Sequence, residues 1–306
     1  MKNVLVVGSS NTDMIIRVPR IPRPGETVLG GEFSMAAGGK GANQAVAAAR
    51  AGGRVTFVAR VGDDDFGARA LAAFEAEGID TRFVVRAPAS PSGIALITVD
   101  ERGENSISVA SGANALLSAA DVDAAGDAFA AADIVLVQLE SPLATVEAAV
   151  RKAGEKGVPV VLNPAPARPL DDGLLARVSV LTPNEHEAAA LAGIAVEDEA
   201  GARRAAGRLK ARGAAAVVVT LGERGVFASS PGFEGHVPAF KVDPVDTTAA
   251  GDVFNGAFAV ALAEGVELRS AVRFANAAAA ISVTRMGAQP SAPTRKEIGQ
   301  LLAKRR

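Results

Sequence analysis

Short apolar runs that alternate with helix-like segments constrain the fold of this chain more than any other feature. The first run, VLVVG at 4–8, is uninterrupted and mostly β-branched, which is typical of a strand buried on both faces of a parallel sheet. Similar runs recur along the chain, and the helix-like segments between them commonly end at glycine. Repeated strand and helix units predict an α/β fold with a mostly parallel central sheet and helices on both of its faces. The expected strands of that sheet are 4–8, 55–61, 134–139, 158–162, 178–181, 216–220 and 226–229.

Two pairs of strand-like segments without an intervening helix interrupt this pattern. The first pair lies on either side of a proline-rich turn within about 14–35, and the second pair lies within about 92–111. Two such hairpins predict a small antiparallel sheet outside the main one, placed as a lid over its strand ends. We therefore expect one domain over 1–306, made of an α/β core and this lid, whose exposed face can also pair with a second copy of the chain.

Composition excludes several classes of protein. The chain of 306 residues is 49% hydrophobic and 22% charged, which is ordinary for a globular enzyme. Without cysteine it cannot use disulfide or thiolate chemistry, and with only two histidines any bound metal should be a hard ion with oxygen ligands. A net charge of -2 gives no basic field for nucleic acid, and we interpret the basic cluster at 304–306 as a solvated helix end. No apolar run has the length of a membrane span or a signal-peptide core, so we expect a cytoplasmic protein without a membrane partner.

The stretch VDTTAAGDVFNGA at 245–257 is a loop that turns into a helix. Its small residues Ala249, Ala250 and Gly251 stand at the helix start, where free backbone N–H groups let an anion such as phosphate approach. Asp252 would repel that anion unless it has another task, and accepting a proton from an attacking hydroxyl is one. The alternative is that Asp252 only caps the helix, because aspartate is preferred at helix starts.

A second glycine-rich helix start is GGKGAN at 38–43. It is not a P-loop, because Ser34 stands where the first glycine of G-x-x-x-x-G-K-[ST] is required and Gly41 where serine or threonine is required. What remains is a helix start that can hold a polyhydroxy or anionic ligand close to the backbone, or else a flexible turn with a solvated lysine. The first turn of this helix carries Lys40, Asn43 and Gln44.

Several expected strands run into polar residues, and the carboxyl ends of parallel strands are where ligands bind in such sheets. The first strand is followed by a polar turn at 9–13. A dinucleotide-binding G-x-G-x-x-G fingerprint would need three glycines here, and only Gly8 is present, which disfavours an NAD-dependent oxidoreductase. Further strand ends are followed by Glu140, Asn163, Asn184 and, after Thr220, by a turn with two glycines.

Two of these strand ends permit alternative interpretations. Asn184 and Glu187 could reach a hydrated Mg²⁺ or phosphate oxygens, or they could form an N-cap with a capping-box glutamate. The turn at 220–225 could lie against a nucleotide, or it could be a hairpin loop.

Five segments together carry a resemblance to a known family. They are GGKGANQAVAAAR from Gly38, QLESP at 138–142, LNPAPAR at 162–168, TPNE at 182–185 and VDTTAAGDVFNGA at 245–257. In these segments, and along essentially its whole length, the chain resembles the ribokinase-like (PfkB) carbohydrate kinases. One departure is Ala249, where the commonest form of the family motif has glycine. The resemblance implies a three-layer α/β/α sandwich with a small antiparallel β-sheet lid, which usually contributes to a homodimer.

The resemblance also implies an activity. It points to an ATP-dependent sugar kinase that phosphorylates the 5-hydroxyl of D-ribose to give D-ribose 5-phosphate and ADP, with Mg²⁺ and an activating monovalent cation, usually K⁺. A kinase for a related furanose or nucleoside, such as 2-deoxyribose or adenosine, remains an alternative, because few hydroxyl contacts distinguish these substrates. A non-catalytic sugar-binding protein of the same fold is a further alternative, although it would have no reason to keep Asp252 after the Ala-Ala-Gly turn.

Residue roles follow from the same resemblance. It makes Asp252 the base and the backbone N–H groups of 249–252 the anion hole for the transferred phosphoryl group. The sugar would be held by Asn11, Asp13, Gly39, Lys40, Asn43 and Glu140 together with Asp252. ATP would face Asn184, Thr220, Gly222, Gly225, Gly251 and Asn276, with Glu187 near Mg²⁺ through water. The monovalent cation would lie at Asp246, Thr248, Ser282, Arg285, Gly287 and Ser291, mostly on backbone oxygens.

Overall fold

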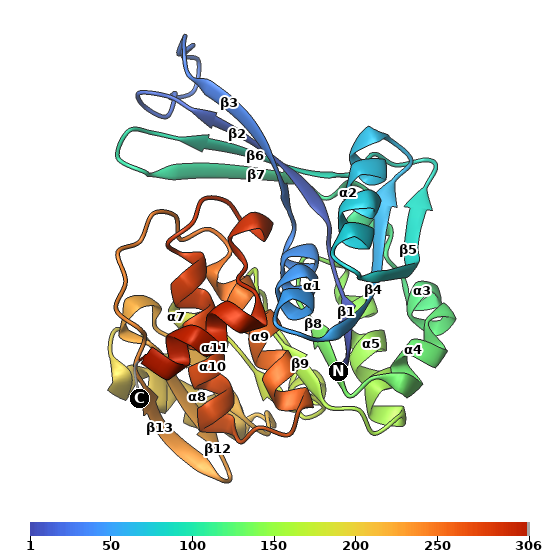
Figure 1. Cartoon of the computed structure of the whole chain (residues 1–306), viewed down its shortest axis with the longest axis vertical. Coiled ribbons are helices and arrows are strands. Elements are labelled where there is room, and N and C mark those ends of the chain that lie inside the picture. Colours follow the sequence, from blue (N-terminus) through green and yellow to red (C-terminus); the bar gives the residue numbers. More distant parts are fainter. Residues whose placement is uncertain (305–306) are drawn as a thin grey trace.

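The computed structural model describes residues 1–304 and contains a large twisted sheet with a second, smaller sheet above it (Figure 1). The strand order in the large sheet is β13-β12-β11-β10-β9-β8-β1-β4-β5, and all neighbours are parallel except those of β12. Arg305 and Arg306, in the basic cluster expected at a helix end, lie outside the described residues. The strands are β1 (Asn3–Val7), β4 (Arg54–Gly62), β5 (Asp80–Ala87), β8 (Ile134–Val137), β9 (Val160–Leu162), β10 (Val180–Leu181), β11 (Val217–Thr220), β12 (Val226–Ser230) and β13 (Phe233–Val237).

The central strand β1 shows why the sheet needs helices on both faces. Val4 and Val6 belong to one hydrophobic core, while Leu5 and Val7 point the other way into a second core. The predicted α/β/α layering is therefore confirmed. The first core is closed by α1 (Lys40–Arg50), α2 (Asp65–Ala76), α9 (Ala250–Ala263), α10 (Leu268–Ser282) and α11 (Arg295–Lys304). The second is closed by α3 (Ala119–Ala124), α4 (Gly126–Ala131), α5 (Leu143–Glu155), α6 (Asp172–Leu175), α7 (Glu185–Ala192) and α8 (Glu199–Ala211).

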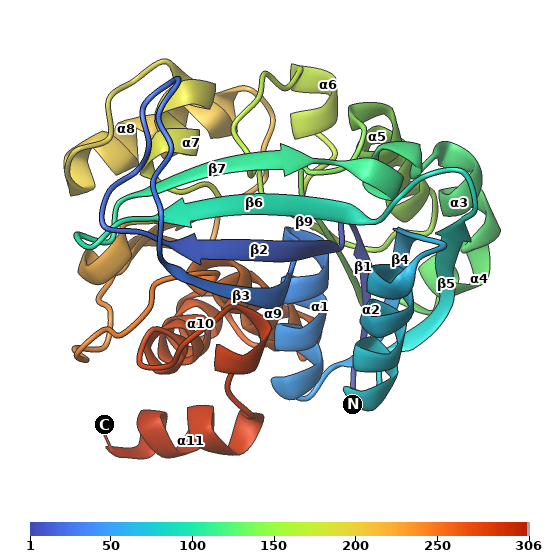
Figure 2. The same cartoon turned by 90° about the horizontal axis from the view of Figure 1, so that it is seen from above.

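The smaller sheet is the expected lid, and its strand order is β3-β2-β6-β7 (Figure 2). Both of its hairpins are antiparallel, as expected, but the central pair β2 and β6 is parallel. The reason is that β2 continues from β1 and β6 follows β5, so both leave the same edge of the main sheet in the same direction. The lid strands are β2 (Asn11–Arg17), β3 (Glu32–Gly38), β6 (Gly93–Val99) and β7 (Asn105–Ala110), and 18–31 is the loop of the first hairpin.

Two strands of the main sheet, β5 and β13, are absent from the sequence-based assignment. Both lie at the edges of the sheet and mix exposed and buried positions, so neither gives the continuous apolar run of a central strand. Among the described residues, 1–304, no helix has the length and apolar character needed to cross a membrane.

A glycine allows the two helices beneath the lid to pack closely. A Cβ added at Gly256 of α9 would lie 2.6 Å from the carbonyl oxygen of Gln44 and 2.7 Å from the Cβ of Ala47, both on α1. No real Cβ has such contacts, so the helices can approach to this distance only with glycine at the crossing. The first turns of α1 and α9 are thereby held side by side under the lid.

We expect Gly256→Ala to lower the free energy of unfolding by about 1–3 kcal/mol, because the added methyl group overpacks the α1–α9 contact. Gly207→Ala in α8 is the matched control, since Gly207 is exposed and its added Cβ would meet no atom within 4 Å. The control should gain roughly 0.5–1 kcal/mol, as is usual when alanine replaces glycine inside a helix. Urea unfolding of both variants checks the pair, and equal effects would contradict the proposed close contact.

Candidate active site

The site lies at the point where the strand order of the main sheet reverses. The chain goes from β1 through the lid to β4 on one side, and later returns to β8 on the other side of β1. Such a point leaves a crevice at the carboxyl ends of the strands, where open α/β sheets bind ligands. A cavity of about 330 Å³ lies there, between the strand ends and the lid.

Residues from five separate predicted motifs meet in this cavity. It is lined by every residue predicted to hold the sugar and by the whole segment 249–252. From the predicted nucleotide and metal sets it includes Asn184, Thr220, Glu187 and Thr248. The lid contributes Ala95, Ile97, Ile107 and Val109, which the sequence analysis did not single out. Their shared face could have been found from the alternation along β6 and β7, because residues two apart in a strand point the same way.

Asp252 is in the first turn of α9, and only 6% of its surface is exposed. Its Oδ2 accepts a hydrogen bond from Asn43 Nδ2 at 2.9 Å, and its Oδ1 accepts one from Gln44 Nε2 at 2.9 Å. Both donors are on α1, and the N-cap of α9 is Ala249, which makes no side-chain capping bond. The alternative that Asp252 only caps its helix is therefore wrong.

The start of α9 is an open anion cradle. Within residues 1–304, the backbone N–H groups of Gly251 and Asp252 have no hydrogen-bond partner, and a Cβ added at Gly251 would meet no atom within 4 Å. Ala249 has φ 57° and ψ 14°, which is the left-handed region and the only positive φ of a non-glycine residue in the described chain. Glycine usually occupies this region, and the commonest form of the family motif has glycine at this position. The left-handed conformation explains that preference, and it is strained for the alanine present here.

The start of α1 is occupied by a carboxylate of the protein itself. Glu140 Oε2 accepts hydrogen bonds from the backbone N of Lys40 at 2.9 Å and from Ser9 Oγ at 2.6 Å. An anion at a helix N-terminus is stabilised by the free N–H groups there. The two helix starts therefore differ: α1 already holds an anion, and α9 is free to bind one.

The charges of the cavity are unbalanced toward the acidic side. Burial raises the pKa of Asp252, an effect that the Lys40 ammonium and the amides of α1 oppose. Burial also raises the pKa of Asp13 to about 6, with further increases from Glu140 and Asp252 and a decrease from Lys40. Burial alone would lower the pKa of Lys40, but the surrounding carboxylates outweigh it and raise that pKa. A cavity with several buried acceptors and one cation suits an uncharged ligand that carries many hydroxyl donors.

Asn184 and Glu187 form the capping box that was one of their two interpretations. Asn184 Oδ1 accepts from the backbone N of Glu187 at 2.8 Å, and Glu187 Oε2 accepts from the backbone N of Asn184 at 2.9 Å. Both residues also line the cavity, and burial raises the pKa of Glu187. Thr220 lies beside Asn184 through a parallel bridge. The turn at 220–225 is a hairpin loop, because it joins the antiparallel strands β11 and β12.

Three residues predicted to face ATP lie outside the cavity lining. Asn276 Nδ2 donates to the carbonyl oxygens of Val237 and Pro238 at 3.3 and 3.2 Å. A Cβ added at Gly225 would meet the same segment, at 2.3 Å from the carbonyl oxygen of Val237. A Cβ added at Gly222 would meet no atom within 4 Å. Gly225 and Asn276 thus both pack against 237–239.

The residues predicted for the monovalent cation come from two segments that lie against each other. Asp246 joins the segments, since its Oδ1 accepts from the backbone N of Thr248 at 2.9 Å and its Oδ2 from that of Gly287 at 2.8 Å. The other predicted side chains are engaged locally. Ser282 and Ser291 donate to backbone carbonyls three residues earlier, and Arg285 pairs with Glu297. Backbone oxygens therefore remain as the main possible cation ligands.

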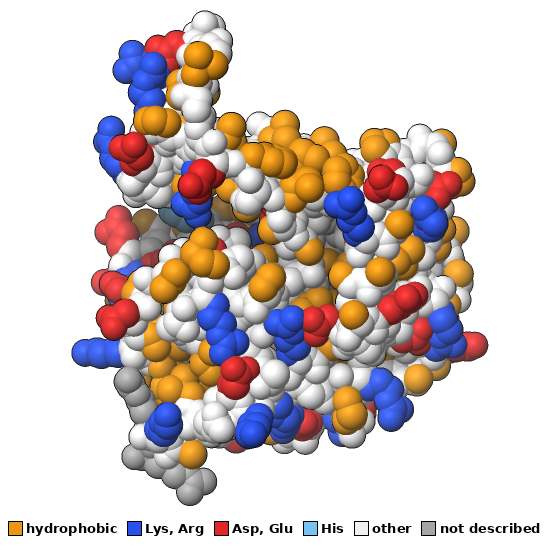
Figure 3. Space-filling model, turned by 45° about the horizontal axis from the view of Figure 1, so that its top comes forward, with side chains coloured by type: hydrophobic (Ala, Val, Ile, Leu, Met, Phe, Trp, Pro, Cys, Tyr) orange, Lys and Arg blue, Asp and Glu red, His pale blue; other side chains and the backbone are white. Residues whose placement is uncertain are grey.

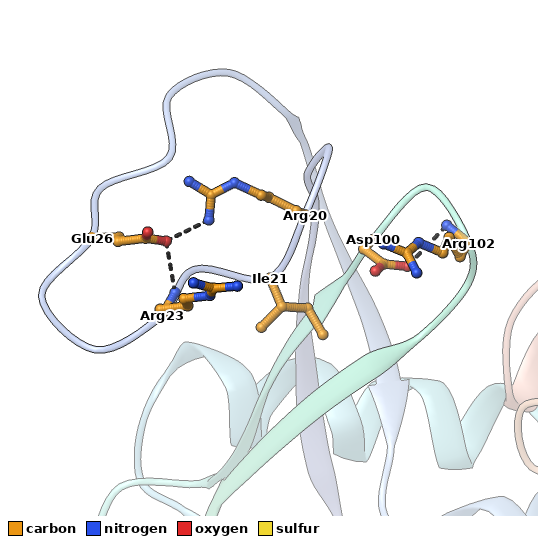
Figure 4. Close-up of a pocket in the computed structure, with 6 residues that line it drawn as sticks. All are labelled: Arg20, Ile21, Arg23, Glu26, Asp100 and Arg102. Carbon is orange, nitrogen blue, oxygen red and sulfur yellow. Dashed lines mark hydrogen bonds and ion pairs between the residues drawn. The ribbon is translucent and has the colours of Figure 1, made fainter.

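A second hollow, of about 470 Å³, lies at the tip of the lid (Figure 4). It is far from the strand ends and is formed by the loops of the two lid hairpins. Its carboxylates are engaged within their own loops, because Glu26 pairs with Arg20 and Asp100 accepts from the backbone N of Arg102.

Comparison with known proteins decides the family. A family profile described as "pfkB family carbohydrate kinase" matches residues 1–295. The chain belongs to this family. Curated ribokinases of Haemophilus influenzae and Bacillus subtilis are 48% and 43% identical over 301 and 303 residues, which covers 98% and 99% of this chain and 98% and 100% of those proteins. A solved structure of Arabidopsis thaliana ribokinase complexed with ribose and ATP is 33% identical with a TM-score of 0.90, and the match covers 98% of each chain.

Membership of the pfkB family confirms the resemblance seen in the motifs and replaces the oxidoreductase alternative with a carbohydrate kinase. A curated deoxyribokinase of Salmonella typhi is also similar, at 38% identity over 302 residues, 98% of this chain and 99% of that protein. Relatives at this distance thus differ in the pentose that they are named for.

Substitution of Ala249 tests the shape of the anion cradle. We expect Ala249→Val to lower kcat by about 10²-fold, because a β-branched residue is strongly disfavoured in the left-handed region and would shift the N–H groups of the cradle. Ala249→Gly is the matched control and should stay within about twofold of wild type, because glycine adopts this conformation freely. Steady-state kinetics of the two variants checks the pair, and a fully active valine variant would contradict the cradle.

Proposed function

We propose that this chain is an ATP-dependent kinase that phosphorylates the 5-hydroxyl of D-ribose. The observation that carries the proposal is the buried Asp252 carboxylate beside two unpartnered N–H groups, in a cavity lined with hydrogen-bond acceptors. The full-length similarity to curated ribokinases supports ribose as the sugar.

The sugar would be bound by hydroxyl groups that donate to fixed acceptors. Asp13 and Glu140 offer carboxylate oxygens, and Asn43 Oδ1 is buried without a hydrogen-bond partner in the described chain. A buried acceptor without a partner is costly, and a sugar hydroxyl would satisfy it. The apolar lid residues would cover the sugar and exclude water.

Phosphoryl transfer would then need placement more than a strong base. As the bond between the sugar oxygen and the γ-phosphorus forms and the bond to ADP breaks, Asp252 would accept the hydroxyl proton. The N–H groups of Gly251 and Asp252 would donate to the oxygens of the transferred group.

ATP would lie along Asn184, Thr220 and Gly222, with its phosphates toward the start of α9. Gly225 and Asn276 would support the adenine base of ATP indirectly, through the segment 237–239, against which both residues pack. Within residues 1–304 no three His, Cys, Asp or Glu side chains are grouped as a metal centre, so Mg²⁺ would be held mainly by the ATP phosphates. Glu187 lines the cavity, and its second carboxylate oxygen could bind a water of that ion.

A monovalent cation such as K⁺ fits the two segments that Asp246 joins. Backbone oxygens near Thr248, Ser282, Arg285, Gly287 and Ser291 would be its ligands. The ion would supply charge that holds the loop before α9 against 283–287, where the backbone N–H groups of Val245 and Asp246 already donate to Val283.

We propose further that the chain forms a homodimer through its lid. The lid face opposite the cavity carries exposed apolar side chains, including Ile16, Phe33, Met35 and Leu96. Hydrophobic side chains are seen gathered over the lid in Figure 3. A twofold interface brings the same patch of both subunits together, and an uncharged apolar face can pack against an identical face without repulsion between like charges.

Light scattering tests the dimer. It should give twice the mass of 30.9 kDa, and a monomer at all concentrations would contradict the dimer.

We expect Asp252→Asn to lower kcat by about 10² to 10⁴ while the sugar Kd stays within about threefold of wild type. The exposed Asp65→Asn in α2 is the control and should leave both unchanged. A coupled ADP-release assay over D-ribose, 2-deoxyribose, fructose and adenosine, with and without K⁺, measures the activity and ranks the substrates. A variant with near-normal kcat would remove Asp252 as the base, and no sugar-dependent ADP release by wild type would favour a non-catalytic sugar-binding protein.

Sugar affinity should depend on pH through Asp13. Its pKa is raised to about 6 by burial and by Glu140 and Asp252, against Lys40, so the carboxylate is ionised at pH 8 and protonated below pH 6. Because the ionised form accepts two hydroxyl hydrogen bonds and the protonated form accepts fewer, we expect the ribose Kd to rise about tenfold from pH 8 to pH 5. Calorimetric titration without ATP measures this. Asp13→Asn should bind weakly with little pH dependence, and a profile like that of wild type would assign the titration to another group.

A further inference from the structure

A chain of buried amide side chains lies directly behind the Asp252 carboxylate. Gln44 Nε2 donates to Asp252 Oδ1 at 2.9 Å and to Asn163 Oδ1 at 3.1 Å. Gln44 Oε1 accepts from Gln138 Nε2 at 2.6 Å. Gln44 and Gln138 are 0% and 1% exposed and do not line the cavity, so neither can touch a substrate there.

The pattern of donors and acceptors admits one orientation of Gln44. Because Gln138 donates to its oxygen, the Nε2 of Gln44 faces the carboxylate. A rotated Gln44 would place its own oxygen against Asp252, where two acceptors repel. Gln138 therefore fixes Gln44, and Gln44 fixes one oxygen of Asp252 while Asn43 holds the other.

The second arm of the network reaches the anion cradle. Asn163 Nδ2 donates to the carbonyl oxygen of Thr182 at 2.9 Å, and Thr182 Oγ1 donates to Asn255 Oδ1 at 2.6 Å. Asn255 Nδ2 in turn donates to the carbonyl oxygen of Gly251 at 2.8 Å. That carbonyl belongs to the same peptide group as the unpartnered N–H of Asp252, so the bond polarises the N–H toward a bound anion. One network thus reaches both the carboxylate and the backbone donor of Asp252.

Stability alone is a poor explanation for this arrangement. The amides are buried, and Gln138 Oε1 has no hydrogen-bond partner within the described chain. A half-satisfied buried polar network costs more than apolar side chains of the same shape. A chain that needed only a packed core at this place would be more stable with apolar residues at 44 and 138.

We propose that Gln44 is a positioning residue for phosphoryl transfer, held by Gln138, that keeps the Asp252 carboxylate aimed at the acceptor hydroxyl. This inference rests on the proposed kinase function. It assigns to Gln44 and Gln138, which do not line the cavity, a role in turnover and none in sugar or ATP binding.

The test uses Gln44→Met and Gln138→Met, which keep the volume and remove the hydrogen bonds. We expect Gln44→Met to lower kcat about 10- to 100-fold with both KM values within about threefold, and Gln138→Met to lower kcat less. Gln138→Met does not touch Asp252, so it keeps the test open if Gln44→Met fails to fold. In an Asp252→Asn background, Gln44→Met should change kcat by less than about twofold, because its effect passes through the carboxylate.

Thr145→Val is the control for a merely structural effect. Thr145 on α5 is buried and donates to the carbonyl oxygen of Leu117, away from the cavity. The variant should lower Tm and leave kcat unchanged. If the wild-type enzyme is active and both glutamine variants have unchanged kcat, the inference is overturned. It is also overturned if Gln44→Met lowers kcat as much in the Asp252→Asn background as in the wild type. A wild-type chain without sugar-dependent ADP release would overturn the proposed function itself.

Discussion

The contact between the first turns of α1 and α9 is the interaction on which the rest of the site depends. It buries the Asp252 carboxylate to 6% exposure, and a buried charge is tolerated only where hydrogen bonds or opposite charge compensate for lost water. The compensation comes from Asn43, Gln44 and Lys40, all within the first five residues of α1. These groups reach Asp252 only because Gly256 lets the helices approach closely.

The two helix starts differ in whether their backbone N–H groups are free to bind an anion. The start of α1 is neutralised by Glu140, which also holds the turn after β1 through Ser9. It therefore presents carboxylate oxygen to the cavity in place of free N–H groups. The start of α9 keeps its N–H groups free within the described chain, because its N-cap, Ala249, provides no side-chain acceptor. In the proposed reaction a phosphoryl group would thus be attracted to one end of the cavity, and hydroxyl donors to the other.

The sequence predicted those parts of the structure that depend on local patterns. Central strands, the lid hairpins, both glycine-rich helix starts and the polar strand ends could be read from residue order. The edge strands β5 and β13 could not, because half-exposed strands lack a continuous apolar run. Gln44 and Asn163 stood out as polar residues at a helix start and a strand end, but the sequence did not show what they contact. Gln44 donates to Asp252 and to Asn163, which lie 208 and 119 positions further along the chain. Asn255 gave no signal, since an asparagine inside an apolar helix has no local pattern that reveals its partner.

The acidic character of the cavity also bears on how the proposed reaction would end. Asp13, Glu140, Asp252 and Glu187 all act on the single ammonium of Lys40. An uncharged sugar would donate hydrogen bonds to these carboxylates, but its phosphate ester would add negative charge among them, in surroundings where burial strengthens the repulsion. While the phosphoryl group is in transfer, the N–H groups of α9 would offset that repulsion. Once the bond to the sugar is complete, the carboxylates proposed to hold the substrate would oppose the product. The same side chains would therefore favour sugar binding before transfer and product release after it.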